Sequence, residues 1–325
     1  MADLAYLVVF LVLFVHTVAH EFVTMSGVTE EDKALDLPPS LSLIVAGLIA
    51  CSARCRRQDF CLYYNYRAKD DDQALGLCEI FDVFLSRKDL SACVKSKPGS
   101  LFVAVPLAKS DPRSCVDYAR VGLTHLPKFY IVDDAGDAYR VTCDFTSEPG
   151  SLWTLVKSDA TPPPQYFTTA LYVNAPKNQD NPNWSQYRLS LPRMEALQNV
   201  STHWRVTCSF PRAGVDYTDY LRGNFSSADP VHVFGPLFEP ACREVEFLNI
   251  RGFTRKHIME PLFQHDGFFE FCIESASAGC GGKWQAVPNA VFSEDNFGLY
   301  GFSNINFRCT NQQDSSTNMW FGSYL

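Results

Sequence analysis

The longest uninterrupted run of apolar side chains lies at the beginning of the chain, from Leu4 to Val15. About a dozen residues are too few to span a bilayer, which needs about 20 helical residues. The small residues Thr17 and Ala19 follow the run at the spacing of a signal-peptidase cleavage site. We therefore expect residues 1–20 to be a secretory signal peptide, and the alternative is a buried N-terminal strand or helix.

A second apolar run, Leu41 to Ala50, leads directly into Cys51 and Cys55. This run is also too short for a membrane helix. A spacing of four places the two cysteines on one helical face, so we predict a core helix that reaches Cys55. The aromatic segment 60–66 and the alternating segment 77–81 predict two strands, with a polar turn between them.

The second half of the chain is dominated by strand patterns. Segments 129–132 and 138–145 alternate and are joined by an Asp/Gly-rich turn, which predicts a hairpin. Segment 153–156 predicts a third strand, segment 267–272 a buried strand, and the alternation over 301–309 a late strand. The pattern as a whole predicts a β-rich α+β protein.

Composition narrows the class of protein. The chain is 46% hydrophobic, with 25 Phe and 14 Tyr, and so has ample apolar surface to fold. Its net charge of -8, from 28 Lys+Arg and 36 Asp+Glu, excludes the basic footprint of a nucleic-acid-binding protein. Long Asp or Glu runs are absent, so we expect any role in mineral growth to be indirect. A length of 325 residues favours two domains.

The cysteines and sequons indicate export. All twelve cysteines follow residue 50, and an even number allows complete pairing in an oxidising compartment. Four of the cysteines, at positions 51, 55, 61 and 78, are clustered in the sequence and could instead bind zinc. Their spacing, however, is not that of paired zinc knuckles. Three Asn-x-Ser sequons, at Asn183, Asn199 and Asn224, predict N-glycosylation.

Catalytic signatures are absent from the sequence. It contains no Gly-x-Ser-x-Gly, no Gly-Asp-Ser-Gly, no His-Glu-x-x-His and no phosphate-binding glycine loop. We therefore expect no enzyme. Calcium binding requires six or more oxygens, and the acidic segments 70–72 and 294–296 supply few. We expect no cofactor, with calcium left open as the alternative.

The first cysteine cluster carries a family resemblance. Cys51, Cys55, Cys61 and Cys78, with the predicted helix followed by strands, resemble the PAN/apple module, in which one helix is covalently attached to a curved antiparallel sheet. The module would span residues 36–108. The resemblance implies the disulfides Cys55–Cys61 and Cys51–Cys78.

A second resemblance begins at Cys115. An aromatic-Ile strand, a strand ending in Cys143-Asp144, and the pair Trp153-Thr154 resemble the start of a fibrinogen-like C-terminal domain. That domain would span 113–325, with the resemblance clear to about residue 160. It implies a disulfide between Cys115 and Cys143. The resulting fold class is α+β and β-rich, with a small disulfide-stapled helix-on-sheet module followed by a fibrinogen-like antiparallel-sheet domain.

The order of a leader, a PAN-like module and a fibrinogen-like domain is similar to that of secreted coral skeletal organic matrix proteins. The phrases 201–205 (Ser-Thr-His-Trp-Arg) and 216–220 (Asp-Tyr-Thr-Asp-Tyr) also resemble that group. The resemblance implies an extracellular setting in biomineralization, with matrix proteins or glycans as partners, no nucleic acid and no membrane span. Our hypothesis is a secreted matrix or adhesion protein that acts by binding, and the alternative is a carbohydrate-recognising fibrinogen-related lectin.

Overall fold

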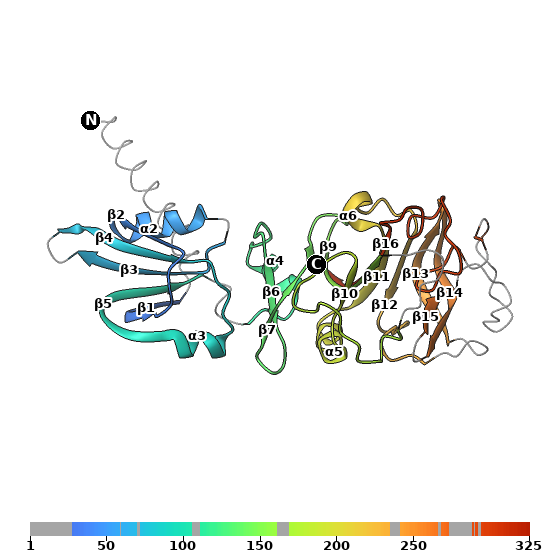
Figure 1. Cartoon of the computed structure of the whole chain (residues 1–325), viewed down its shortest axis with the longest axis horizontal. Helices are drawn as coiled ribbons and strands as arrows, with labels where there is room; N and C mark the ends of the chain where they lie inside the picture. The colour runs from blue at the N-terminus through green and yellow to red at the C-terminus, as the bar shows by residue number, and fades with distance from the viewer. Residues whose placement is uncertain are drawn as a thin grey trace, which may run out of the picture. The chain divides into compact units, whose positions relative to one another are not determined.

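The structure is a computed structural model that describes most of the chain (Figure 1). The described residues are 28–58, 60–69, 72–105, 111–160, 169–234, 241–265, 268–272, 288, 290–291 and 294–325. The predicted signal peptide, residues 1–20, and Asp70 and Asp71 of the acidic turn lie outside these ranges.

The chain folds into two units. The first comprises Met1–Pro112, Val121–Lys128 and Ala135–Ala138, and the second comprises Arg113–Arg120, Phe129–Asp134 and Tyr139–Leu325. Both are built on antiparallel sheets and contain disulfides, which confirms the β-rich class. The PAN/apple-like and fibrinogen-like assignments stay predictions.

The first unit contains a five-stranded sheet in the order β1-β5-β3-β4-β2. Helix α2 packs on one face of this sheet, where Cys51 and Cys55 join Tyr64, Ile80 and Val103 in a buried cluster. Helix α3 lies next to β5 (Figure 1). The elements are β1 (Val28–Leu35), β2 (Leu41–Val45), α2 (Gly47–Arg56), β3 (Tyr63–Lys69), β4 (Asp72–Phe81), α3 (Arg87–Cys93) and β5 (Val94–Ala104).

One sequence prediction in this unit is wrong in part. The apolar run from Leu41 is not a single helix, because its first half forms β2 and pairs with β4 from Leu41↔Ile80 to Val45↔Gly76. Helix α2 starts only at Gly47, whose φ of +85° is a conformation that non-glycine residues rarely adopt. The glycine separates strand from helix inside a run that is apolar throughout.

The second unit contains a nine-stranded sheet whose main path is β10-β9-β16-β11-β12-β13-β14-β15, with β8 paired to β9. The predicted hairpin is confirmed as the pair β6-β7. The strands are β6 (Phe129–Val132), β7 (Ala138–Val141), β8 (Cys143–Asp144), β9 (Ser151–Ala160), β10 (Gln186–Arg188), β11 (His203–Cys208), β12 (Tyr220–Asn224), β13 (Ala241–Ile250), β14 (Phe253–His265), β15 (Phe268–Phe271) and β16 (Ser316–Tyr324). The helices are α4 (Cys115–Arg120), α5 (Leu191–Asn199) and α6 (Phe210–Ala213).

The last strand of the chain, β16, lies inside this sheet between β9 and β11 (Figure 1). It buries Trp320 and Phe321 completely. At Gly322 a Cβ atom would collide with the backbone oxygen of Leu152, so this position accepts only glycine without a shift of the backbone. The C-terminal strand is therefore part of the core.

The strand predicted over 301–309 is not formed. This segment consists of turns, in which Asn304 donates its backbone N–H to the Thr310 hydroxyl at 3.0 Å and Asn306 donates its own to the Asn304 side chain at 2.9 Å. Side chains of this kind compete with sheet ladders for backbone groups. The alternation of apolar and polar residues came from a loop that buries Phe307 and Cys309.

Four disulfides are present among the described residues. Three of them, Cys51–Cys78, Cys55–Cys61 and Cys115–Cys143, are the pairs that the family resemblances imply, and the fourth joins Cys208 to Cys309. Cys242 is also disulfide-bonded, whereas Cys93 is a free thiol. Within the described ranges every helix is too short or too polar to cross a bilayer.

We expect the Cys208–Cys309 disulfide to stabilise the second unit most. It spans a sequence separation of 101, against 6 for Cys55–Cys61. Loop-closure entropy then predicts that replacing both cysteines by serine lowers the free energy of unfolding by about 4.7 kcal/mol, against about 2.4 kcal/mol for the short bridge. All five tryptophans lie in the second unit, so its chemical denaturation is monitored by tryptophan fluorescence. Far-UV circular dichroism monitors the first unit, with Cys55→Ser/Cys61→Ser as the control. Equal losses for the two pairs would contradict the expectation.

Candidate functional site

The most heavily charged region of the interior is centred on Arg205 in β11, whose side chain is 0% exposed. Its Nη2 donates to Asp144 Oδ2 at 2.6 Å and its Nη1 to Glu148 Oε2 at 2.5 Å. The guanidinium carbon lies 4.7 Å from the ring centroid of Trp153 and 5.0 Å from that of Trp320. We call these five residues the arginine cluster.

Local structure explains why the two carboxylates face Arg205. Strand β8 pairs with β9 so that Asp144 lies opposite Trp153. The turn that follows is fixed by Asp144 itself, whose Oδ1 accepts the backbone N–H groups of Thr146 and Ser147. This turn brings Glu148 back toward the sheet, where the hydroxyl of Tyr220 donates to its Oε1 at 2.8 Å.

The electrostatic balance at Asp144 favours the ionised form. Burial by itself would raise the pKa of this carboxyl, but the positive charge of Arg205 and the hydroxyl of Ser147 lower it below the usual 3.8. Buried ions are tolerated only when they are paired and hydrogen-bonded. The cluster meets this requirement through both carboxylates and both indole rings, and it fixes β11, β16 and the 144–148 turn against one another.

A partly exposed surface lies directly above the arginine cluster. Arg222 of β12 connects the two, since its Nη1 is 3.6 Å from Glu148 Oε1 and its guanidinium lies 5.2 Å from the ring centroid of Tyr324. Glu246 accepts from Arg222 at 3.3 Å and lies 3.2 Å from His203 Nε2. We call the following residues the tyrosine patch: His203, Tyr217, Arg222, Glu246, Phe247 and Tyr324.

The rings of the tyrosine patch are held in place while remaining accessible. Tyr324 is 38% exposed and packs edge-on against His203 at a centroid distance of 4.9 Å. Tyr217 and Phe247 are half-buried, with centroids 5.6 Å apart. Burial raises the pKa of Tyr324 to about 12, so its hydroxyl remains a hydrogen-bond donor at neutral pH.

The backbone at Tyr217 is strained. Its φ of +62° lies in the left-handed region, which bulky residues rarely occupy. Arg308 binds the residues on both sides of Tyr217. Its guanidinium donates two hydrogen bonds to the Asp216 carboxylate, at 2.6 and 2.7 Å, and its backbone N–H donates to the Asp219 carboxylate. A strained backbone conformation persists only where surrounding contacts fix it, and such residues are frequent at ligand-binding sites.

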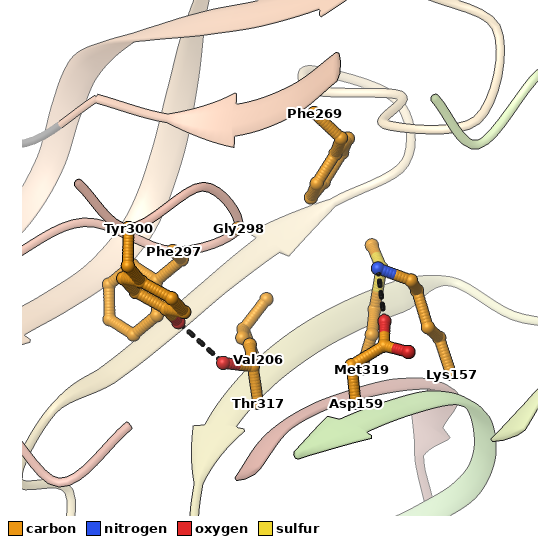
Figure 2. A pocket seen from close by; sticks show the side chains of 9 residues that line it. All are labelled: Lys157, Asp159, Val206, Phe269, Phe297, Gly298, Tyr300, Thr317 and Met319. Atoms are coloured by element: carbon orange, nitrogen blue, oxygen red, sulfur yellow. Dashed lines mark hydrogen bonds and ion pairs between the residues drawn. The ribbon is translucent and has the colours of Figure 1, made fainter. Parts of the chain in front are cut away.

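The second candidate site is a small cavity on the other side of the sheet. Figure 2 shows Lys157 and Asp159 of β9 on one side of it and the hydrogen-bonded pair Tyr300 and Thr317 on the other, with Phe269 close by. Lys157 Nζ is 2.6 Å from Asp159 Oδ2, and Asp159 Oδ1 accepts no hydrogen bond from the described residues. Burial lowers the pKa of Lys157, and Asp159 opposes this shift.

A buried lysine with a lowered pKa is a nucleophile in many enzymes. Here the cavity is about 20 Å³, which is room for about one water molecule. Its lining is otherwise apolar, from Val206, Met319 and Phe297. The pair is therefore a structural ion pair in the core, and the cavity does not admit a substrate.

The predicted glycosylation sites lie in different surroundings. Asn199, at the end of α5, is exposed. Asn183 is half-buried, and its Nδ2 donates to the backbone oxygens of Asn181 and Gln186. Asn224 is half-buried beside the tyrosine patch, where its Nδ2 is 3.4 Å from His203 Nε2. Asn199 is therefore the sequon asparagine most open to modification, although glycosylation itself remains a prediction.

In the 294–296 segment, Asp295 does not offer its carboxylate oxygens to a cation. Asp295 is buried, and its Oδ2 accepts from Arg251 and from the backbone of Val291 while its Oδ1 accepts from Asn304. Asn296 donates to Glu270. Across the described ranges, no group of three or more His, Cys, Asp or Glu side chains is placed to hold a metal ion.

Sequence reasoning missed the arginine cluster, the tyrosine patch and the Lys157 pair. The phrases 201–205 and 216–220 contain Arg205 and Tyr217, but they were noticed only as a resemblance. The local signal that was available is a charged residue at a buried-strand position, namely Arg205 within His-Trp-Arg-Val-Thr-Cys and Lys157 within Leu-Val-Lys-Ser-Asp. The partners of Arg205 could not be identified, because Glu148 and Asp144 lie 57 and 61 positions away. Asp159 is only two positions from Lys157, but the strand pattern alone does not show that the pair is buried.

Removing the positive charge of the arginine cluster should destabilise the second unit. We expect Arg205→Met to lower the free energy of unfolding by about 3–5 kcal/mol at pH 7, because Asp144 would remain buried without a cation and Glu148 would keep only Arg222, at 3.6 Å. The exposed Arg212, paired with Asp314, is the control, and Arg212→Ala should cost less than about 1 kcal/mol.

The pH dependence tests the cause of this effect. The lowered pKa of Asp144 contributes stability above pH 3.8, which the native protein loses as the pH falls through the lowered value. In Arg205→Met the carboxylates gain stability on protonation, so the difference between the two proteins should shrink below about pH 4. A difference that stays constant from pH 7 to pH 3 would show that lost packing, not lost charge, explains the destabilisation.

The Lys157 pair should behave as a mutually dependent unit. We expect Lys157→Met and Asp159→Leu each to lower the free energy of unfolding by about 3–5 kcal/mol, because each leaves one buried charge unpaired. The double substitution should return to within about 1 kcal/mol of the native protein. Urea denaturation of the native protein, the two single variants and the double variant measures the four free energies of unfolding. If the losses of the single variants add up in the double variant, the two residues are not a structural ion pair.

No protein-family model, no curated protein and no solved structure matches this chain, so its function has to be argued from the chemistry of these sites.

Proposed function

We propose that this protein is a secreted extracellular matrix or adhesion protein that acts by binding, and that the tyrosine patch is its contact surface. The observation that carries the proposal is the combination of accessible aromatic rings with a buried ionic support. Tyr324 and Tyr217 are reachable from solvent, and Arg222 links them to Arg205 and Glu148 beneath.

Aromatic and arginine side chains supply much of the affinity at protein interfaces. Tyrosine buries a large area on binding and loses little conformational entropy, because it has only two side-chain torsions. Here the entropy cost is reduced further, since Arg222 stacks on Tyr324 and His203 packs on its edge. The surface is organised before a ligand arrives, which favours binding.

The covalent framework supports an extracellular setting. Disulfides persist in oxidising compartments, and both units contain them. The resemblance to PAN/apple and fibrinogen-like modules, and to skeletal organic matrix proteins, points in the same direction. We infer that the partners are matrix proteins or glycans, and that any role in biomineralization is through the organic matrix.

The second candidate function is that of a carbohydrate-recognising protein. Tyr217 and Tyr324 offer apolar ring faces for the C–H face of a sugar, while Glu246 and Arg222 supply an acceptor and a donor for hydroxyls. The arginine cluster and the tyrosine patch together contain two arginines, Arg205 and Arg222, against three carboxylates, Asp144, Glu148 and Glu246. This balance favours an uncharged saccharide over an acidic one.

Removing both tyrosine rings should weaken binding without unfolding the protein. We expect Tyr217→Ala/Tyr324→Ala to weaken binding to an immobilised extracellular-matrix extract at least about tenfold, because truncating aromatic contact residues costs more than ~1.4 kcal/mol. Phe302→Ala is the matched control, since Phe302 is 60% exposed and lies outside the patch. Surface plasmon resonance measures the binding of all three proteins.

Failure of the native protein to bind matrix extract, or an equal loss in Phe302→Ala, would refute the proposal. A glycan array probed with the same three proteins separates the two functions. Binding of neutral glycans that disappears in the double variant supports the lectin, whereas matrix binding with no array signal supports protein recognition.

A further inference from the structure

The first unit contains a groove that the proposed function does not use. It has a volume of about 340 Å³ and lies between α3 and the face of the sheet formed by β1 and β5. Ligand sites in proteins begin at about 300 Å³. The groove is therefore large enough for a small molecule, unlike the cavity at Lys157.

The groove exists because the two faces of this sheet are covered unequally. On one face, α2 is joined to β4 by the Cys51–Cys78 disulfide and packs against Tyr64, Ile80 and Val103. On the other, α3 has only seven residues, and none of them is buried. A helix of this length leaves the β1–β5 ladder partly uncovered.

The floor of the groove is apolar and firmly fixed. Phe102 and Ala104 of β5 are each 1% exposed, and Phe102 stacks on Tyr63 at a centroid distance of 6.2 Å. Leu90 of α3 and Val94 add to the apolar lining. Phe102 and Ala104 contact almost no water, so an apolar ligand segment would instead displace water from the half-buried Leu90 and Val94, which is favourable at about 25 cal/mol per Å².

The rim of the groove carries an excess of positive charge. Among the described residues, Arg87 and Lys33 line it together with one carboxylate, that of Glu30. Within the described part of the chain, neither the Arg87 guanidinium nor the Lys33 ammonium has a side-chain partner; Arg87 uses only its backbone N–H, which donates to Asp111 at 2.8 Å. Two unpaired cations beside an apolar floor complement a molecule with an anionic head and an apolar tail.

We propose that this groove binds a small amphipathic carboxylate, with its apolar tail on Leu90 and Val94 and its carboxylate bound by Arg87. Arginine matches a carboxylate with two parallel hydrogen bonds, which gives geometric selectivity as well as affinity. A volume of 340 Å³ corresponds to about ten non-hydrogen atoms, taking ~30 Å³ for each water-sized group. This inference is independent of the tyrosine patch, which belongs to the second unit.

Two sources supply ligands of this chemistry, namely a medium-chain fatty acid and the C-terminus of an apolar peptide. Octanoate and N-acetyl-leucine are the probes for the two sources, and 1-octanol is the uncharged control. Isothermal titration calorimetry of the full chain should show saturable one-site binding of at least one carboxylate. Binding of 1-octanol should be at least about tenfold weaker, since it lacks the charge that Arg87 recognises.

Variants locate the binding. Arg87→Ala should weaken carboxylate binding at least about tenfold. Lys88→Ala is the matched control, because it removes the same charge from the neighbouring position of α3 but does not line the groove. Ser91→Phe, at an exposed groove-lining position, should fill the groove and abolish binding while thermal unfolding stays unchanged.

The outcomes separate the sources and decide the proposal. Binding of octanoate alone identifies a lipid-like ligand, and binding of N-acetyl-leucine alone identifies a peptide C-terminus. Binding of both shows that the groove recognises any small amphipathic carboxylate. Absence of saturable binding by either carboxylate would overturn the proposal. Equal effects of Arg87→Ala and Lys88→Ala, or undiminished binding by a folded Ser91→Phe, would overturn it as well.

Discussion

The buried guanidinium of Arg205 constrains the second unit more than any other group. A charge with no exposed surface has to be matched by partners at hydrogen-bond distance, and here they come from the 144–148 turn, which lies about 60 residues away in the sequence. The indole of Trp320 on β16 faces the same guanidinium. The final strand, which lies between β9 and β11, completes the surroundings of this charge through Trp320, and this links β16 to the 144–148 turn.

Two other buried cations in this sheet are also held by polar partners. Arg188 of β10 is 2% exposed and donates to the backbone oxygens of Ala170 and Val173, at 2.7 and 2.5 Å. Lys157 pairs with Asp159 of the same strand, β9, on the face of the sheet opposite to that of Arg205. Arg205 and Arg188 take their partners from other segments of the chain and so hold those segments in place, whereas Lys157 pairs within its own strand. Stability is not the main gain, because apolar side chains of equal volume pack as well.

Local features could be predicted from the sequence where the pattern fits one structure only, and features fixed by distant residues could not be predicted. The β6-β7 hairpin follows from alternation and a turn between adjacent segments. The change from strand to helix at Gly47 was not predicted, because a short apolar run is compatible with a buried strand and with a buried helix. The loop over 301–309 failed because Asn304 and Thr310 bond to backbone groups that an alternating pattern assigns to a ladder. Arg205 appeared as one polar residue in a strand, since Glu148 lies 57 positions away.

The two sites differ in charge, and this difference determines what each unit can recognise. The tyrosine patch rests on arginines that carboxylates already neutralise, so a ligand gains from ring contact and hydroxyl hydrogen bonds, and salt should affect its affinity little. The groove beside α3 keeps Arg87 and Lys33 unneutralised, so a carboxylate gains Coulomb energy there that salt would screen. Each site belongs to a unit that contains its own disulfides. If both proposals hold, the chain has two sites for two chemically different ligands.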